Sequence, residues 1–376
     1  MRKASKRTRM LLVLASVAGL ASWAAPGASA HPRGEGLVFT STNAAGSNAV
    51  LVFNRAADGA LTAAGSFPTG GAGTGSPLDS QAALALGRDH DQRLFVVNAG
   101  SNSISEFAVE GDGLTLLDTV PSGGVDPVSL AVSDDLLYVL NEGDSGSPGN
   151  ISGFRLERGL TPIPGSSRPL SAAAVSAPQI AFDPRGDVLV VTEEATNLID
   201  TYTIGRDGRA NGPVSHASAG QTPFGFAFDR RGDLVVSDAF GGASNAGALS
   251  SYDVSRNGSL ATISGPVADN QSAPCWVVTT ANGRFAYTSN TGSGTISSYT
   301  IGNDGSLALL APGAGSTGTG SAPIDIALSR NSRYLYALGS ATHAISGFRV
   351  QSDGSLTSLA DGPAGLPASA TGLLAR

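Results

Sequence analysis

The octapeptide NDGSLALL, residues 303–310, is one of seven related stretches that recur along the chain. Each contains a glycine in a short, mostly polar segment with an apolar run nearby. These glycines are Gly59, Gly113, Gly159, Gly208, Gly258, Gly305 and Gly354, and their separations are 54, 46, 49, 50, 47 and 49 residues. A regular period of this length is the signature of a repeat protein, in which each repeat is one supersecondary unit.

Three further markers keep the same period. The first marker is a short apolar run that begins at a proline, such as PVSLAV or PIDIAL. The second is a run such as RLFVVN, and the third is an alternating run such as TISSYTI. The prolines are Pro77, Pro127, Pro178, Pro223, Pro274, Pro323 and Pro367. One unit therefore holds four short strands, named A to D here, joined by turns. Seven such units predict an all-β, seven-bladed β-propeller of four-stranded antiparallel blades.

The two ends of the repeat array predict how the ring closes. The expected units are 36–74, 75–124, 125–174, 175–220, 221–270, 271–320 and 321–366. The first unit opens at strand B, in GLVFTST, and the tail PASATGLLA from residue 367 has the pattern of the missing strand A. We predict that residues 367–376 add this strand to the first blade, because this removes two exposed sheet edges. A helical or unstructured tail is the alternative.

Residues 1–30 have the basic segment, the apolar core and the ASA cleavage motif of a secretory signal peptide. We therefore expect residues 31–376 to form a single secreted domain, in the extracellular space or the cell envelope. Later apolar runs are too short to span a bilayer, so membrane insertion is not expected. Cys275 is the only cysteine, which excludes an intrachain disulfide.

The charge of the mature chain excludes some partners. Five of the 23 basic residues lie in the signal peptide, which has no acid, so 18 arginines remain against 30 acidic residues, a net charge of −12. Nucleic acids and anionic membranes need clustered positive charge, so neither is expected as a partner. We expect a monomer that binds a small neutral molecule or another extracellular ligand.

Strand direction decides which face of the ring carries the candidate site. The A–B and C–D turns share one face, called the lower face here, and the B–C and D–A loops share the upper face. Most of the mature arginines fall in lower-face turns. The upper face receives the ends of strand B and the starts of strand A. We therefore expect an axial funnel on the upper face that is acidic and amide-rich, with an aromatic wall and almost no cation.

The candidate site residues all belong to this upper rim. The candidate catalytic residues are Glu142, Glu193, Glu194 and Asp238, and the candidate substrate-binding residues are Asn98, Asn141, Gln179, Phe224, Trp276 and Asn290. Strand alternation turns one carboxylate of the Glu193-Glu194 pair toward the axis and the other away. The asparagines are also common turn formers, and Trp276 is also explained by core packing.

Metal chemistry has little support in the sequence. The four histidines are not at the spacing of zinc ligands. Oxygen ligands on the upper rim suit calcium, so calcium is the cofactor that the sequence leaves open, with no ligand set assigned.

The units resemble the propeller-type lactonase family, which includes 6-phosphogluconolactonases and carboxymuconate cyclases. The resemblance extends over essentially the whole mature chain, and TTANGRFAYTSNTGSGTISSYTIGNDGSL, residues 279–307, carries it most clearly. Residues 42–71, TNAAGSNAVLVFNRAADGALTAAGSFPTGG, are similar to the opening of secreted members. The resemblance implies a propeller fold and a lactone as the substrate class.

The resemblance also implies a catalytic histidine shortly after a strand A proline, with acidic and arginine partners. Gln179 stands at that position here, and Glu193 and Glu194 occupy the acidic strand end, followed by Asn197 and Asp200. The arginine partners are missing, because the arginines lie on the lower face. An acidic funnel would weaken the binding of the anionic substrates of the named enzymes.

Two functions remain open at this point. The first is a secreted hydrolase of a neutral lactone, a carboxylic ester hydrolase, with Glu193 or Glu194 as the general base. In that hypothesis Asn98, Asn141 or Asn290 stabilises the oxyanion. The second is a non-catalytic extracellular propeller that binds a sugar, a peptide or a partner protein. A cyclase-type isomerase is a less favoured third alternative.

Overall fold

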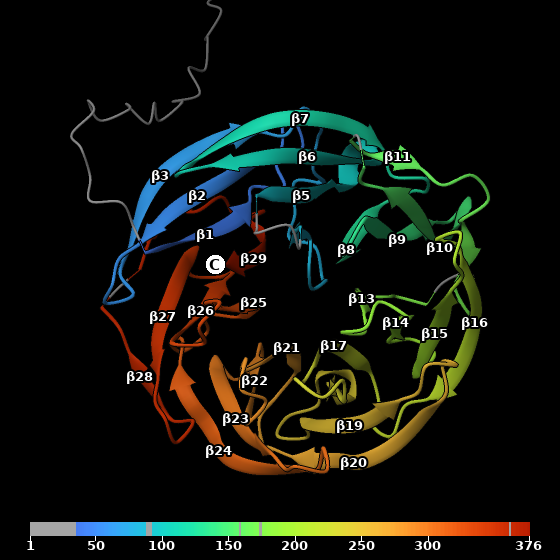
Figure 1. Ribbon diagram of the computed structural model, residues 1–376. Helices are drawn as coiled ribbons and strands as arrows, with labels where there is room; N and C mark the ends of the chain where they lie inside the picture. The colour runs from blue at the N-terminus through green and yellow to red at the C-terminus, as the bar shows by residue number, and fades with distance from the viewer. Residues whose placement is uncertain (1–34, 88–91, 158, 173–174, 361) are drawn as a thin grey trace, which may run out of the picture. The chain divides into compact units, whose positions relative to one another are not determined.

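The computed structural model describes residues 35–87, 92–157, 159–172, 175–360 and 362–376, so the predicted signal peptide lies outside the described residues. The strands in these ranges form seven antiparallel sheets, arranged as the blades of a ring (Figure 1). The seven-bladed, all-β propeller is thereby confirmed. Among the described residues, no helix has both the length and the apolar character to cross a membrane.

The blades follow one another in chain order, and each is given from its innermost strand outward. Blade 1 contains β29 (Thr371–Ala375), β1 (Gly36–Ser41), β2 (Ala49–Arg55) and β3 (Leu61–Pro68). Blade 2 contains β4 (Leu84–Leu86), β5 (Arg93–Asn98), β6 (Ser103–Glu110) and β7 (Gly113–Pro121). Blade 3 contains β8 (Pro127–Ser133), β9 (Leu136–Asp144) and β10 (Ser147–Arg155), and the short strands β11 (Thr161–Pro162) and β12 (Arg168–Pro169) both pair with β10.

The other four blades are regular. Blade 4 contains β13 (Gln179–Phe182), β14 (Val188–Glu193), β15 (Leu198–Ile204) and β16 (Ala210–Ala217). Blade 5 contains β17 (Pro223–Phe228), β18 (Leu234–Asp238), β19 (Ala248–Val254) and β20 (Leu260–Ala268). Blade 6 contains β21 (Pro274–Thr279), β22 (Phe285–Asn290), β23 (Thr295–Ile301) and β24 (Leu307–Ser316). Blade 7 contains β25 (Pro323–Leu328), β26 (Tyr334–Gly339), β27 (Ala344–Val350) and β28 (Leu356–Ser358). Two 3₁₀ turns, η1 (Ala99–Ser101) and η2 (Phe240–Gly242), follow β5 and β18.

The C-terminal strand closes the ring, as the sequence predicts. β29 pairs antiparallel with β1, with Val38 opposite Ala375 and Phe39 opposite Leu374. Blade 7 is tied to the same strand, because the backbone N–H of Leu373 donates to the carboxyl of Asp325 at 2.8 Å. The C-terminal strand therefore completes the sheet of blade 1 and is linked to blade 7 by one buried hydrogen bond.

The repeated turn glycines join five of the blades to the preceding one. In five units the carbonyl oxygen of this glycine accepts a hydrogen bond from a hydroxyl of the preceding blade. The donor and acceptor pairs are Tyr138 and Gly208 (2.8 Å), Thr201 and Gly258 (2.7 Å), Ser251 and Gly305 (2.8 Å), Tyr287 and Gly354 (2.9 Å), and Tyr336 and Gly59 (2.8 Å). The tight C–D turn thus serves both the hairpin and the contact between blades.

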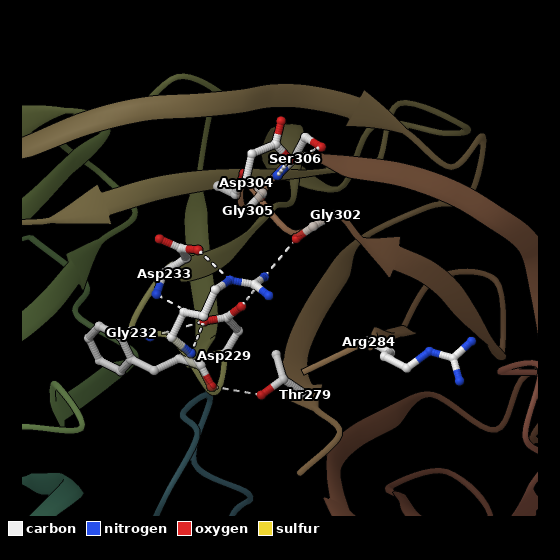
Figure 2. A network of polar contacts seen from close by, with 12 residues as sticks. Asp229, Gly232, Asp233, Thr279, Arg284, Gly302, Asp304, Gly305 and Ser306 are labelled. Carbon is white, nitrogen blue, oxygen red and sulfur yellow. Dashed lines mark hydrogen bonds and ion pairs between the residues drawn. The ribbon is translucent and has the colours of Figure 1, made fainter. Parts of the chain in front are cut away.

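Several lower-face arginines are occupied in the same region. Oδ1 of Asp229 accepts three backbone N–H bonds from its own A–B turn, and its other oxygen pairs with Arg231 at 2.5 Å. Arg231 also donates to the carbonyl of Gly302 in the next blade at 2.7 Å. Figure 2 shows Asp229 and Asp233 beside the turn that contains Gly305. Arg185 repeats the arrangement with Asp183 (2.8 Å), so these arginines serve the joints between blades.

Gly305 provides a stability test of this joint. Its φ is +79°, and a Cβ built on it would lie 2.7 Å from Oδ2 of Asp233 and 2.7 Å from Ile263. We expect Gly305→Ala to lower the free energy of unfolding by about 2 kcal/mol, from left-handed strain and overpacking together. Thermal unfolding measures this, with Gly46→Ala as the control, because a Cβ there meets nothing within 4 Å. Equal melting temperatures for the two variants would contradict the prediction.

The connection between blades 1 and 2 departs from the repeat. Pro127, Pro223, Pro274 and Pro323 are the first residues of their strands, whereas β4 begins only at Leu84, seven residues after Pro77. The intervening residues 78–82, called the axial strap here, bond to several blades. In Figure 1 this part of the chain lies inside the ring of innermost strands. The expected strand A directly after Pro77 is therefore displaced.

Candidate functional site

One residue at the upper end of strand B is buried between neighbouring blades; it is the last residue of the strand in blades 2, 4, 5 and 6, whereas β9 of blade 3 continues to Asp144. Asn98, Asn141, Glu193, Asp238 and Asn290 occupy equivalent positions in blades 2 to 6, and each has 0% of its surface exposed. Strand alternation directs these side chains away from solvent and toward polar groups of strand C and the D–A loops. Five candidate residues thus share one structural environment, and their direct contact with a ligand stays a prediction.

The asparagines in this position make similar hydrogen bonds. Asn98 donates to Ser105 Oγ at 2.8 Å, and Asn290 donates to Ser297 Oγ at 2.9 Å. The oxygen of Asn98 accepts from Asn48 (3.0 Å) and Thr69 (2.6 Å) of blade 1. These amides bond buried hydroxyl and amide groups, whereas the side-chain oxygens of Asn141 and Asn290 have no hydrogen-bond partner among the described residues.

The two acidic members of the set are also held inside the protein. Glu193 accepts hydrogen bonds from the backbone N–H of Ser171 (2.9 Å) and from Thr196 Oγ1 (2.7 Å). Burial raises the pKa of the nearby Asp200 to about 7, and the charge of Glu193 adds to this rise. Burial likewise raises the pKa of Asp238 to about 7, although a hydrogen bond from Ser250 partly opposes the change.

The expected aromatic wall belongs to the core. Phe224 and Trp276 are buried and pack edge to face, with ring centroids 4.9 Å apart. Gln179, at the position where the resemblance implies a histidine, donates to the carbonyl of Phe226 (3.0 Å) and accepts its N–H (2.6 Å). The Gln179 side chain therefore clamps blade 4 to blade 5 by pairing with the backbone.

A different set of carboxyls gathers near the axis, called the axial acidic cluster here. It consists of Asp79 of the axial strap, Asp126 before β8, Glu142 of β9 and Glu194 directly after β14. Glu194 and Glu142 are half-buried, and Asp79 is exposed to solvent. Two of the four predicted catalytic residues are thus brought together, while Glu193 and Asp238 lie in separate blade interfaces.

Mutual repulsion and burial control the protonation of this cluster. The pKa of Glu194 is raised to about 8. Burial is the largest cause, and the charges of Asp79 and Glu142 also contribute to the rise. Burial followed by the charges of Asp126 and Asp79 also raises the pKa of Glu142. The pKa of Asp79 is raised as well, because the surrounding blades displace part of its hydration although the side chain still contacts solvent. At neutral pH the cluster therefore holds at least one proton, on Glu194.

Ser176 links the two glutamates of the cluster. Its hydroxyl donates to Glu194 at 3.4 Å and also lowers the pKa of Glu142, and its backbone carbonyl accepts the N–H of Glu194 at 2.9 Å. Ser176 has a φ of +49°, and residues 82, 126, 222, 273 and 322 before other A strands share this left-handed conformation. Sequence reasoning missed Ser176 and Asp79, because both lie in D–A connections without a distinctive motif.

The described residues contain no group of three or more histidine, cysteine, aspartate or glutamate side chains that could hold a metal ion. The groups that shift the pKa values of Glu142 and Glu194 are carboxyls and Ser176, with no arginine among them. The groups acting on Glu142 and Glu194 thus supply like charge and one hydroxyl, and the pKa of about 8 keeps Glu194 mostly neutral at neutral pH.

A groove of about 640 Å³ with a mixed lining, which includes Val120 and Val125, lies on the rim between blades 2 and 3. Hydroxyl, amide and backbone groups line it without a charged side chain; they belong to Ser101, Asn102, Ser103, Thr119, Ser147 and Asn150, with Pro121 and Pro148 beside them. This lining suits a neutral polar ligand better than an ion.

The sequence of blade 6 resembles a known family. Residues 237–324, which contain blade 6 and the adjoining parts of blades 5 and 7, match the family model "Lactonase, 7-bladed beta-propeller". The match covers less than a quarter of the chain, and it agrees with the seven-bladed fold. No curated protein matches its sequence.

Solved structures share the fold of this propeller at low sequence identity. A periplasmic gluconolactonase of Pseudomonas aeruginosa is 15% identical, with a TM-score of 0.69 over 89% of this chain and 98% of that one. A protein of Bacteroides uniformis with a provisional assignment as a 6-phosphogluconolactonase is 18% identical, with a TM-score of 0.67 over 89% and 98%. A protein of unknown function from Desulfotomaculum acetoxidans is 14% identical, with a TM-score of 0.67 over 90% and 98%. At these identities the likeness concerns the fold alone.

The buried acids predict how stability depends on pH. Asp200 and Asp238 have pKa values of about 7 in the folded protein, and Glu194 of about 8, against ordinary values near 4 when unfolded. Between the unfolded-state pKa and the folded-state pKa, each carboxyl is protonated in the folded protein and ionised in the unfolded protein. The free energy of unfolding therefore falls as pH rises from about 4 through 8. Each group contributes a slope of up to about 1.4 kcal/mol per pH unit in this window.

Melting temperatures measured from pH 5 to pH 9 check this prediction. We expect the protein to be most stable at the acidic end of the range, and Asp238→Asn to flatten the profile by removing one titrating group. The exposed Asp207, Asp304 and Asp353 have lowered pKa values and act below pH 4, outside the range. A melting temperature that rises with pH across this range would contradict the assignment.

Proposed function

We propose that this propeller hydrolyses a lactone without a negative charge, at the axial acidic cluster. The observation that carries the proposal is the meeting of carboxyls from two blades and the strap, with Glu194 held in its neutral form at neutral pH. Acids and bases for one reaction are commonly found where environments push neighbouring pKa values apart. The lactonase family supports the choice of a lactone as the substrate class.

The proposed reaction uses one neutral and one ionised carboxyl. Glu142, or Asp79 beside it, accepts a proton from a water molecule while that water adds to the lactone carbonyl carbon. Glu194 gives its proton to the ring oxygen as the bond between this oxygen and the carbonyl carbon breaks. The products are an alcohol and a carboxylic acid on one open chain, and transfer of a proton from Glu142 to Glu194 restores the starting state.

The electrostatics of the cluster favour a neutral substrate. No arginine is among the groups that act on Glu142 and Glu194, so a phosphate or carboxylate on the substrate would meet only like charge. The product, once it ionises, carries a carboxylate that the cluster repels. The same repulsion that disfavours anionic substrates therefore assists product release.

A panel of lactones tests the proposal. We expect turnover of δ-gluconolactone or another neutral lactone and little turnover of the matched 6-phosphate, as followed by acid release at constant pH. Glu194→Gln should lower kcat about 100-fold or more, because the variant cannot donate a proton. Activity should also decline above about pH 8, where Glu194 ionises. The control is Glu110→Gln, which changes an exposed glutamate at the end of β6.

The outcomes of this panel are decisive for the hydrolase. Absence of turnover for every neutral lactone, or full activity of folded Glu194→Gln, would contradict the mechanism. A clear preference for the phosphorylated lactone would contradict the electrostatic argument.

The groove between blades 2 and 3 favours a second candidate, a binding propeller for a neutral sugar. Its hydroxyl and amide lining matches the groups that recognise sugar hydroxyls, and its prolines offer an apolar surface. Binding of oligosaccharides without lactone turnover, abolished by Ser147→Trp in the groove, would support this candidate over the hydrolase.

We also propose that the chain acts outside the cytoplasm. The signal-like residues 1–30 support this, and the similar Pseudomonas aeruginosa gluconolactonase is a periplasmic protein. We expect protein recovered from the medium or the cell envelope to begin at His31, as N-terminal sequencing would show. An intact Met1 on the exported protein would refute the cleavage site.

A further inference from the structure

The axial strap, residues 78–82, connects blades that lie far apart around the ring. At its start, the N–H of Leu78 donates to Thr371 Oγ1 of β29 in blade 1 at 3.2 Å. Ser80 Oγ donates to the carbonyl of Val128 of β8 in blade 3 at 2.8 Å. A segment that bonds blades 1 and 3 while leading into blade 2 must run on the axial side of all three.

Gln81 anchors the strap to three further points. Its backbone N–H donates to the carbonyl of Pro178 before blade 4 (3.0 Å), and its carbonyl accepts from Ser129 Oγ of blade 3 (2.6 Å). Its side-chain amide donates to the carbonyl of Val277 in blade 6 (2.8 Å) and accepts the N–H of the same residue (3.1 Å). The backbone and the side chain of one residue thus bond to opposite sides of the ring.

Blades 5 and 6 are fitted closely around this amide. The indole of Trp276 donates to the carbonyl of Ser80 at 2.9 Å. Gly225 of blade 5 leaves no room for a side chain, because a Cβ there would lie 2.3 Å from Oε1 of Gln81 and 2.4 Å from the carbonyl of Cys275. Gln81 has 9% of its surface exposed, so its pairing with Val277 is shielded from competing water.

Asp79 lies between these anchors, and its position follows from theirs. The neighbouring side chains are both buried, and that of Ser80 donates a hydrogen bond to the carbonyl of Val128. Asp79, between Leu78 and Ser80, remains exposed to solvent. Its charge acts on Glu142, on Glu194 and on the thiol of Cys275 in blade 6. Asp79 of the cluster is therefore supplied by the D–A connection into blade 2. Among the described connections into blades 2, 3, 5, 6 and 7, this one alone is extended.

We propose that Gln81 is the positioning residue of the axial acidic cluster: its paired hydrogen bonds to Val277 hold the strap across the axis and keep Asp79 beside the glutamates of blades 3 and 4. The inference concerns the geometry of the cluster and goes beyond the proposed hydrolysis. It stands or falls independently of whether any lactone is turned over.

Cys275 provides a direct reporter of strap position. It is the only cysteine of the chain, it is buried beside Gly225 and Gln81, and its burial raises the pKa of the thiol. Gln81→Leu keeps the size of the side chain and removes both hydrogen bonds. We expect this variant to react with iodoacetamide about tenfold faster than the wild type or more, since two lost hydrogen bonds make strap opening easier.

Gln179→Leu is the matched control, because Gln179 pairs with the backbone of Phe226 in the same manner without touching the strap. Gly225→Ala is a second variant, which displaces the Gln81 amide sterically from the blade 5 side. Both strap variants should increase alkylation of Cys275, and Gln179→Leu should leave the rate near that of the wild type. Equal rates in folded Gln81→Leu and wild type would overturn the proposal, as would an equal increase in Gln179→Leu.

Positioning of Asp79 has its own readout. In ¹³C NMR spectra of labelled glutamate carboxyls, the titration midpoint of Glu194 should fall toward lower pH in Gln81→Leu, because the Asp79 charge moves away while Glu142 and Asp126 remain. An unchanged midpoint would contradict the positioning role even if the thiol becomes reactive.

Hydrogen exchange of the wild-type protein covers the case in which neither strap variant folds. The amides of Leu78 and Gln81 should exchange about as slowly as those of the inner strands, and rapid exchange at both would refute the strap as a fixed element.

Discussion

At five blade contacts a hydroxyl of one blade donates a hydrogen bond to the turn-glycine carbonyl of the next, and this bond constrains how the two blades are aligned. A β-sheet blade satisfies its own backbone internally, so blades associate mainly through side-chain packing, which sets distance but tolerates sliding. A directional bond to a carbonyl at a fixed point of a tight turn removes that freedom. The glycine is needed because the turn has a positive φ and because the preceding blade approaches too closely for a Cβ, as at Gly305. Register around the ring is thereby defined at the lower face.

With the lower face fixed, alternation along strand B determines what the axis receives. One residue at the upper end of the strand turns into the blade interface, and the next residue lies nearer the axis. At this next position the blades carry Thr42, Ala99, Glu142, Glu194, Ala239, Thr291 and Ser340. Acids thus occur only in blades 3 and 4, which are neighbours, and the Asp126 and Ser176 loops lie beside them. The repeat supplies seven equivalent positions, and five of them carry small or neutral residues. The two glutamates in neighbouring blades therefore concentrate negative charge on one side of the axis.

The architecture was predictable from sequence because glycine and proline spacing reports turns directly, and turns define strands. The closing strand was predictable for the same reason, since a unit without strand A implies a partner for β1. The site was predictable only in part. Glu142 and Glu194 were expected on the upper rim, but Asn98 and Asn290 were expected there with equal reason. A shift of one residue along strand B decides whether a side chain faces the blade interface or the axis. This register depends on bulges and loop geometry that composition does not encode.

Asp79 illustrates why the remainder required the structure. The strap is a short polar linker in sequence, and the course of such a linker depends on distant partners. Gln81 and Val277 are 196 positions apart, and no local pattern connects them. A symmetric ring of seven identical units would place equal groups around its axis and would favour no ligand orientation. One extended connection breaks this symmetry, and it delivers a charge beside the two blades that already carry acids. Because burial and neighbouring negative charge both favour the neutral form of a carboxyl, this arrangement keeps a proton on Glu194 at neutral pH.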